Sequence, residues 1–240
     1  MLDSVLIVVL ISANAEWKPV KEALKPALVE TSPYGEFFVH TVAGTPVVFL
    51  HGGWGKVAAA ASTEYAIGRW QPHLLINLGT CGGIRGRVER HEILLVTKTF
   101  VSDIHEAMGD SAEAIAHYTT TIDLDWLGPT FPWQARRAPI ASADRDLTPK
   151  EVPILAEQHD AIAADWESAA IAYVAKRRGV RLIILRGVSD LVGPDGGDAM
   201  GNVAEFQKGA TIVMRRLLDG LPRVVEHVRP RLPNGAPARP

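Results

Sequence analysis

Val180-Arg181-Leu182-Ile183-Ile184-Leu185-Arg186-Gly187-Val188-Ser189-Asp190 is the stretch of sequence that decides the fold class. Its first six residues form a largely apolar run, which is typical of a parallel strand buried on both faces. Asp190 follows just past the carboxyl end of that strand, where ligands bind in open α/β sheets. A carboxylate beside a buried strand is costly unless it has a task. We therefore predict an α/β fold with Asp190 in a ligand site, the simpler alternative being an N-cap or an Asx turn.

Strand and helix signals alternate along most of the remaining chain. Further strands are predicted at residues 5–11, 74–78 and 93–96, and a hairpin at 37–43 and 46–51. Helices are predicted at 16–24, 56–70, 168–178 and 206–218, the third ending at the C-cap residue Gly179. Residues 102–139 have mixed polarity and several turn residues, so we expect an irregular excursion there.

Composition narrows the class of protein. The chain has 240 residues, 47% of them apolar and 22% charged, which is ordinary globular usage. A net charge of −2 gives no basic face for nucleic acid and no polybasic membrane patch. The single cysteine, Cys81, rules out an internal disulfide framework and favours a reducing compartment, so we expect a cytoplasmic protein.

The two ends of the chain bear on domain organisation. The apolar run at residues 5–11 is short and lacks a basic flank, so it is predicted to be a core strand and not a signal peptide. We expect one domain over residues 1–222, because no linker divides the chain. Residues 223–240 are rich in proline and arginine and are predicted to form a flexible tail.

Two glycine-rich segments lie after predicted strands. The backbone amides of Gly53-Trp54-Gly55-Lys56 precede a helix and are placed to meet an anion or a hydroxyl, although a plain tight turn is the more common explanation. Gly79-Thr80-Cys81-Gly82-Gly83 allows close approach of a ligand and adds the Thr80 hydroxyl, the alternative being a turn that needs positive φ. No histidine base is placed beside Cys81, so it is not predicted to be a nucleophile. The eight histidines show no metal-ligand spacing, and we expect neither a metal nor a cofactor.

A second acidic segment is Ala164-Asp165-Trp166-Glu167-Ser168-Ala169-Ala170, which begins a predicted helix. Glu167 is a candidate for chemistry there, and Glu16 is another near the N-terminus. Their simpler explanations are a carboxylate that favours the helix dipole and an exposed helix residue, respectively.

Five segments together resemble the nucleoside phosphorylase and nucleosidase superfamily, and within it the methylthioadenosine/S-adenosylhomocysteine nucleosidases. They occur in the family order and are Ser12-Ala13-Asn14-Ala15-Glu16, Gly53-Trp54-Gly55-Lys56-Val57-Ala58-Ala59, Asn77-Leu78-Gly79-Thr80-Cys81-Gly82-Gly83, Asp165-Trp166-Glu167-Ser168-Ala169-Ala170 and Arg186-Gly187-Val188-Ser189-Asp190. The resemblance implies a three-layer α/β/α domain with a mixed, twisted central sheet. It also implies a homodimer or a higher homo-oligomer.

The resemblance further implies cleavage of the N-glycosidic bond of a purine nucleoside through an oxocarbenium-like ribosyl transition state. Asp190 matches the acid that protonates the purine N7, Glu167 the carboxylate that holds the ribose hydroxyls, and Glu16 the group that orients the attacking water. Substrate contacts are implied for Thr80, Gly82, Trp54, Trp166, Asp165, Arg186 and Ser189.

Four features of the sequence bear on the nucleophile and the substrate. Asn77 stands where many hexameric phosphorylases have a phosphate-binding arginine, which favours water, although Arg186 keeps a phosphorylase open as the alternative. Trp54 and Trp166 replace smaller or more flexible residues, so each ring either reshapes the pocket or packs in the core. Residues 142–146 match the base-binding turn only in part. An adenosine-type nucleoside is the predicted substrate.

Overall fold

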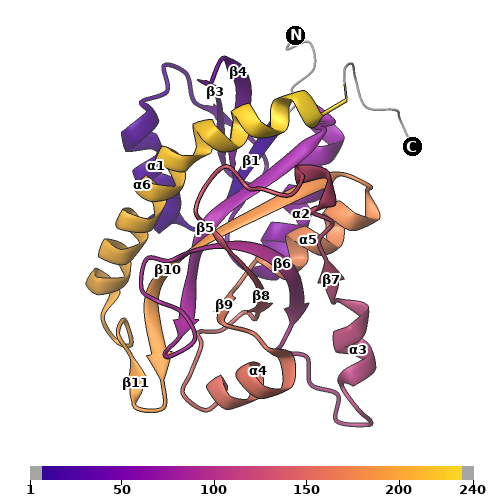
Figure 1. Cartoon of the computed structure of the whole chain (residues 1–240), viewed down its shortest axis with the longest axis vertical. Helices are drawn as coiled ribbons and strands as arrows, with labels where there is room; N and C mark the ends of the chain where they lie inside the picture. The colour runs from indigo at the N-terminus through magenta and orange to yellow at the C-terminus, as the bar shows by residue number, and fades with distance from the viewer. Residues whose placement is uncertain (1–6, 234–240) are drawn as a thin grey trace.

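A mixed sheet of eleven strands lies at the centre of the computed structural model, which describes residues 7–233 (Figure 1). The strands are β1 (Ile7–Ile11), β2 (Glu30–Thr31), β3 (Glu36–Val42), β4 (Thr45–His51), β5 (Leu74–Ile84), β6 (Ile93–Val101), β7 (Thr120–Thr121), β8 (Arg136–Ser142), β9 (Ala163–Asp165), β10 (Arg181–Gly193) and β11 (Gly196–Gly197). The helices are α1 (Asn14–Leu24), α2 (Gly55–Trp70), α3 (Ala112–His117), α4 (Val152–His159), α5 (Ser168–Arg177) and α6 (Val203–Val228), with short 3-10 turns η1 (Asp125–Leu127) and η2 (Arg229–Arg231).

The sheet order is β11-β10-β6-β8-β9-β5-β1-β4-β3-β2, with β7 paired to β6. Parallel pairs, such as β1 with β4 and β5, mix with antiparallel pairs, such as β10 with β6. Because β5 also pairs with β10, the strands β5, β10, β6, β8 and β9 close into a hydrogen-bonded ring. The prediction of a mixed central sheet is confirmed.

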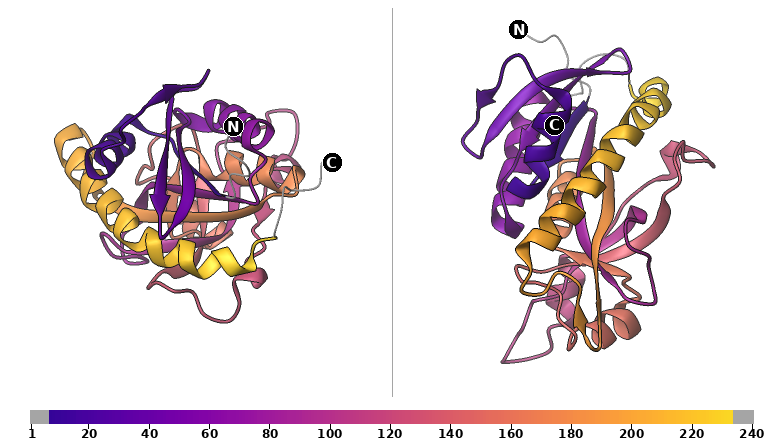
Figure 2. Two further views of the ribbon diagram at one scale, coloured as in Figure 1. Left: turned by 90° about the horizontal axis from the view of Figure 1, so that it is seen from above. Right: turned by 90° about the vertical axis from the view of Figure 1, so that its left-hand side faces the viewer.

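Helices cover both sides of the sheet. α1 packs against α6 on one side, and α2 packs against α5 on the other (Figure 2). Helix α6 turns a continuous apolar face inward, because Val213, Leu217, Leu221 and Val224 recur at helical spacing and are buried. The three-layer prediction is confirmed, as are the hairpin of β3 and β4 and the end of α5 at Gly179, whose φ is +64°.

Both strands that carry the site are longer than predicted. β5 continues through Gly79–Gly83 to Ile84, and β10 continues past Leu185 to Gly193. The two strands pair with each other along almost their whole length, and that pairing keeps both chains extended. The turn interpretation of residues 79–83 is therefore wrong, and none of the three glycines there has a positive φ. Asp190 likewise lies within a strand and not beyond its end.

The other main differences between the predicted and the observed elements lie in the C-terminal half of the chain. Strand β8, helix α4 and strand β9 were not predicted, although residues 102–135 are as irregular as expected, with only α3, β7 and η1. Helix α6 continues ten residues beyond residue 218, and Val224, Val225 and Val228 are buried. Residues 223–228 are thus part of the core and not of a tail, while residues 234–240 lie outside the described part of the chain. No helix between residues 7 and 233 is long and apolar enough to cross a membrane.

Candidate active site

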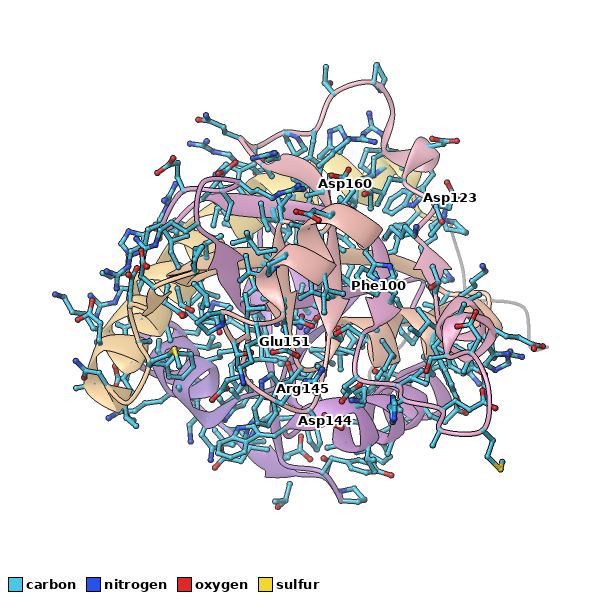
Figure 3. The ribbon with its side chains drawn as sticks, turned by 90° about the horizontal axis from the view of Figure 1, so that it is seen from below. Phe100, Asp123, Asp144, Arg145, Glu151 and Asp160 are labelled. Atoms are coloured by element: carbon cyan, nitrogen blue, oxygen red, sulfur yellow. The ribbon has the colours of Figure 1, made fainter. Side chains whose placement is uncertain are left out.

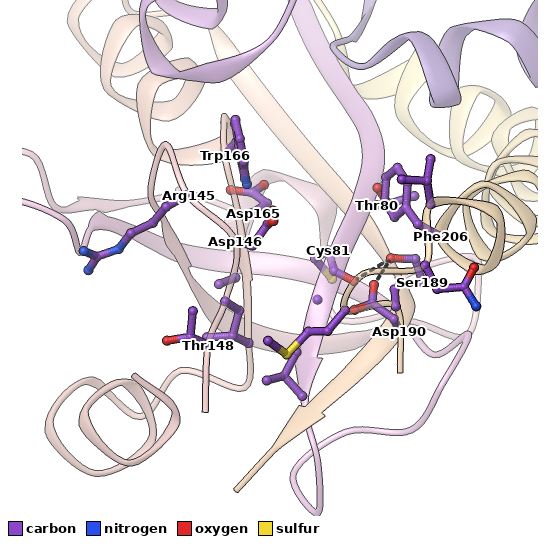
Figure 4. Close-up of a pocket in the computed structure, with 18 of the residues that line it drawn as sticks. Thr80, Cys81, Arg145, Asp146, Thr148, Asp165, Trp166, Ser189, Asp190 and Phe206 are labelled. Carbon is purple, nitrogen blue, oxygen red and sulfur yellow. Dashed lines mark hydrogen bonds between the residues drawn. The ribbon is translucent and has the colours of Figure 1, made fainter. Parts of the chain in front are cut away.

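A cavity of about 550 Å³ opens where β5, β9 and β10 meet the loops before α2, α4 and α6 (Figure 4). Its volume lies within the range typical of small-molecule sites. Nine of the ten predicted site residues line it, namely Glu16, Trp54, Thr80, Gly82, Asp165, Trp166, Glu167, Ser189 and Asp190. The tenth, Arg186, lies behind the cavity wall and is fully buried. The fold therefore brings together groups from both ends of the chain.

Arg186 is the centre of a buried network. Its Nε lies 2.7 Å from an Asp165 oxygen and donates to the Ser168 hydroxyl, and its Nη2 donates to Asn77 Oδ1 at 2.8 Å. Its Nη1 has no hydrogen-bond partner among the described residues and lies 3.9 Å from a Glu16 oxygen. Burial opposes the charge of Arg186, but the surrounding carboxylates outweigh burial and raise its pKa.

Residue 79 is a glycine because the guanidinium of Arg186 lies against the backbone there, and not because the chain turns. A Cβ atom added to Gly79 would lie 1.7 Å from Arg186 Nη1 and 3.0 Å from a Glu16 oxygen. Only glycine leaves room for the guanidinium beside the backbone of β5. The sequence signal was therefore correct in marking a close contact, but the contact is with a side chain of the protein.

Asp165 is saturated with contacts inside the protein. One of its oxygens accepts from the Ser142 hydroxyl at 2.6 Å, and the other accepts from the Ser168 hydroxyl and faces Arg186. The backbone amides of Glu167 and Ser168 also donate to Asp165. Asp165 lines the cavity, but its bonds serve to hold Arg186 and the start of α5.

Glu16 lies in the first turn of α1 and is 2% exposed. Its Oε1 accepts from both the backbone amide and the hydroxyl of Thr80, at 2.6 and 2.8 Å, and its Oε2 accepts from the amide of Ala13 at 3.1 Å. The alternative of an exposed helix residue is therefore wrong. The carboxylate is fixed at the cavity wall beside the free Nη1 of Arg186.

Glu167 is the N-cap residue of α5 and is buried, with 7% of its surface exposed, and its side chain makes no capping hydrogen bond to the helix. Its Oε1 accepts from the amide of Gly55 at 3.0 Å, and its Oε2 lies 3.9 Å from Arg186 Nη2. Burial raises the pKa of Glu167 to about 8, with Asp165 and Glu16 adding to the rise and Arg186 opposing it. The sequence indicated that the amide of Gly55 could meet an anion. In the structure this amide donates to Glu167 of the protein itself.

A bulge aims Asp190 into the cavity. The pairing of β10 with β5 shifts register between Val188 and Asp190, so Ser189 is an extra residue in the strand. The Ser189 hydroxyl lies 2.6 Å from Asp190 Oδ1 and 3.3 Å from the carbonyl of Cys81 (Figure 4). Burial raises the pKa of Asp190, and the negative charges of Asp198 and Asp146 add to this rise. Burial also raises the pKa of the Cys81 thiol, which disfavours the reactive thiolate.

The two tryptophans line the cavity and do not fill the core. Trp54, at the N-cap of α2, is 61% exposed, and Trp166 is half-buried. Core packing, the alternative that the sequence left open for Trp54, is therefore wrong.

Two further loops complete the cavity, and the sequence pointed only to the first of them, through the partial match of residues 142–146 to a base-binding turn. The loop between β8 and α4 contributes Arg145, Asp146, Leu147 and Thr148, and the segment before and within the start of α6 contributes Ala199, Met200, Gly201, Asn202, Val203 and Phe206. Glu151 holds the first loop in place, because its Oε1 lies 2.6 Å from Arg145 (Figure 3). Its Oε2 accepts from the backbone amide and the hydroxyl of Thr148. A usable signal for the second loop was Asn202, whose side chain caps α6 by accepting from the amide of Glu205.

Comparison with known proteins places this geometry in context. A family model described as the phosphorylase superfamily matches residues 6–225. The 5'-methylthioadenosine/S-adenosylhomocysteine nucleosidase of Bacillus subtilis is 27% identical over 188 residues, covering 73% of this chain and 81% of the relative. The enzyme of that name from Halalkalibacterium halodurans is 26% identical over 213 residues, covering 83% and 90%.

Solved structures show the same fold. The 5'-methylthioadenosine/S-adenosylhomocysteine nucleosidase of Streptococcus pneumoniae, bound to the transition-state inhibitor MT-ImmA, has a TM-score of 0.74 at 18% identity, covering 92% of this chain and 99% of that one. The Helicobacter pylori enzyme, bound to butyl-thio-DADMe-Immucillin-A, has a TM-score of 0.73 at 18% identity, covering 90% and 97%. At these identities the likeness concerns the fold.

Proposed function

The chain belongs to the phosphorylase superfamily, and from this premise we propose that it is a purine nucleosidase that hydrolyses the N-glycosidic bond of an adenosine-type nucleoside. The observation that carries the proposal is that one cavity is lined by Glu16, Glu167 and Asp190, from three separate segments. The names of the relatives, methylthioadenosine/S-adenosylhomocysteine nucleosidases, support a substrate of that kind.

Asp190 is the proposed acid. The leaving purine needs a proton as the glycosidic bond breaks, and a carboxyl group with a raised pKa keeps that proton closer to neutral pH. The Ser189 hydroxyl can donate to Asp190 Oδ1 when the carboxylate is charged, and to the carbonyl of Cys81 when Asp190 is protonated. This leaves Oδ2 of Asp190 as the oxygen that faces the base.

Glu16 is the proposed partner of the attacking water. Thr80 and Ala13 fix its carboxylate, and the unpaired Nη1 of Arg186 lies 3.9 Å away. A water molecule in the cavity that donates to the Glu16 carboxylate would turn one lone pair toward the sugar.

Glu167 is the proposed ribose ligand. Glu167 lines the cavity, and its Oε2 makes no hydrogen bond with the described residues, so we assign this oxygen to a sugar hydroxyl. With its pKa raised to about 8, Glu167 is charged in only part of the molecules at neutral pH. In that form the buried carboxylate attracts the positive ribosyl group of the transition state more strongly than the neutral ground state, which is the condition for catalysis.

A phosphate nucleophile fits the site less well than water. Arg186 already uses Nε and Nη2 on Asp165, Ser168 and Asn77, so it cannot offer a bidentate fork to phosphate. Three carboxylates surround this one guanidinium and would repel a phosphate dianion.

Product analysis tests the proposal. Purified protein incubated with methylthioadenosine in phosphate-free buffer should release adenine and the free sugar, and added phosphate should not change the products. Release that depends on phosphate and yields a ribose 1-phosphate derivative would assign the protein to the phosphorylases. A binder without turnover would release no adenine under either condition.

We also propose that the protein is a cytoplasmic homodimer or higher homo-oligomer. Trp54 and Val57 are 61% and 82% exposed beside the cavity, and large apolar side chains gathered on a surface favour association. Sedimentation equilibrium tests this, and a monomer at micromolar concentration would contradict it.

A further inference from the structure

An ion cluster beside the cavity is formed by Lys56, in the first turn of α2, and by Asp103 and Asp144, in the loops that follow β6 and β8. Lys56 Nζ lies 2.5 Å from Asp103 and 3.1 Å from Asp144, and the amide of Asp144 donates to Asp103 at 3.0 Å. Burial would raise the pKa of Asp103, but the bonds from Lys56 and Asp144 outweigh it and hold that pKa below its ordinary value. None of the three side chains lines the cavity.

The cluster is connected to Glu167 through two consecutive backbone amides at the start of α2. The amide of Gly55 donates to Glu167 at 3.0 Å, and the next amide, that of Lys56, donates to Asp144 at 2.8 Å. Gly55 has a φ of +75°, and a Cβ atom there would lie 2.7 Å from the Asp144 carboxylate. The backbone at Gly55 is therefore held between the cluster on one side and Glu167 on the other.

We propose that Lys56, Asp103 and Asp144 are positioning residues for Glu167: they fix the amide of Gly55 so that it holds the Glu167 carboxylate toward the substrate. This inference rests on the proposed nucleosidase function, because it assigns Glu167 to the ribose. If the amide of Gly55 moves, Glu167 loses a hydrogen bond that orients its carboxyl group and favours its charged form.

The charged groups that face Glu167 come from three other elements. They are Glu16 on α1, Asp165 on β9 and Arg186 on β10, in addition to the amide of Gly55 on α2. Of these, the Gly55 amide and Arg186 favour the charged form, and the two carboxylates disfavour it. Loss of the Gly55 bond therefore raises the pKa of Glu167.

Kinetics provides the first test. Lys56→Met and Asp144→Ala should each lower kcat/KM by about tenfold to 100-fold, the loss expected from a small displacement of a group that positions the substrate. In a Glu167→Gln background the same substitutions should cost less than about twofold, because residues that act through one another are not additive. Equal losses in both backgrounds would overturn the proposal.

The matched control is Arg178→Met. Arg178 forms an exposed ion pair with Glu64 at 2.6 Å that also connects α2 to the end of α5, and neither residue lines the cavity. The kcat/KM of the Arg178→Met variant should stay at the wild-type value. A loss equal to that of Lys56→Met would mean that any weakening of the contact between α2 and α5 has the same effect, which would also overturn the proposal.

Carbon-13 NMR of labelled glutamate provides a test that needs no turnover. The resonance that disappears in Glu167→Gln should titrate at higher pH in Asp144→Ala and Lys56→Met than in the wild type. Asp144→Ala is the sharper variant, because simple removal of a nearby negative charge would lower that pKa, whereas displacement of the Gly55 amide raises it. A lowered or unchanged value in Asp144→Ala overturns the inference. If the wild type cleaves no nucleoside, the proposed function fails while the titration still decides this inference.

Discussion

Relative to the wild type, the Glu167→Gln substitution should stabilise the protein more in alkaline solution than in acidic solution. Burial raises the pKa of Glu167 from 4.5 to about 8. Because the folded state holds this proton more tightly than the unfolded chain, the contribution of Glu167 to stability is complete below about pH 4.5 and is lost as the pH rises to 8. Glutamine carries no charge at any pH, so the variant escapes that loss.

The magnitude follows from the two pKa values. A pKa of about 8 in place of the ordinary 4.5 corresponds to roughly 5 kcal/mol, because each tenfold change in proton affinity is worth about 1.4 kcal/mol. About 4 kcal/mol of this falls between pH 5 and pH 9. The free energy of unfolding of the variant minus that of the wild type should therefore rise by about 4 kcal/mol over that interval, or roughly 8 to 16 °C in Tm for a chain of this size.

Urea unfolding of both proteins at pH 5, 7 and 9 measures the difference. Glu36→Gln is the control, because bonds from Lys21 and Trp17 hold the pKa of Glu36 below its ordinary value and it is charged throughout the interval. The difference between wild type and Glu36→Gln should therefore hardly change. If the difference for Glu167→Gln also stays within about 1 kcal/mol from pH 5 to pH 9, Glu167 does not hold a proton in the folded protein and the reasoning is refuted.

Asp190→Asn should lower kcat for adenine release by about two to four orders of magnitude without a change in fold, and turnover near the wild-type value would contradict its assignment as the acid. Trp54→Ile should change the free energy of unfolding by less than about 1 kcal/mol, because the ring is 61% exposed. It should shift the relative kcat/KM among adenosine, methylthioadenosine and adenosylhomocysteine by about 1 to 3 kcal/mol, and an unchanged order of preference would remove Trp54 from the substrate pocket. Gly79→Ala should cost about 1 to 3 kcal/mol in urea unfolding, because the new Cβ would lie 1.7 Å from Arg186 Nη1. A Gly79→Ala variant that unfolds like the wild type would show that Arg186 has room to move.

The positions of most regular elements were predictable because their signals are local. Apolar runs at β1 and at the start of β5 and β10, and helical spacing in α2 and α5, depend only on neighbours in sequence. β8 was not predictable in this way, since Arg136–Ser142 begins with two arginines and contains Pro139, and it is a strand because it pairs with β6 and β9. The ends of β5 and β10 were missed for the same reason, since their glycines and polar residues stay extended only through pairing with each other.

The candidate site also has features that depend on local sequence and features that depend on contacts between distant segments. The sequence by itself indicated which side chains were available for chemistry, because Glu16, Glu167 and Asp190 lie in short motifs that together resemble one family. Only the tertiary structure decided which of them are buried, which amide or guanidinium each one meets, and that Asp165 serves Arg186 while Lys56 reaches Asp103 and Asp144. The physical reason is that desolvation, charge interaction and hydrogen bonding depend on distances of a few ångströms between segments that are far apart along the chain, and folding alone fixes those distances.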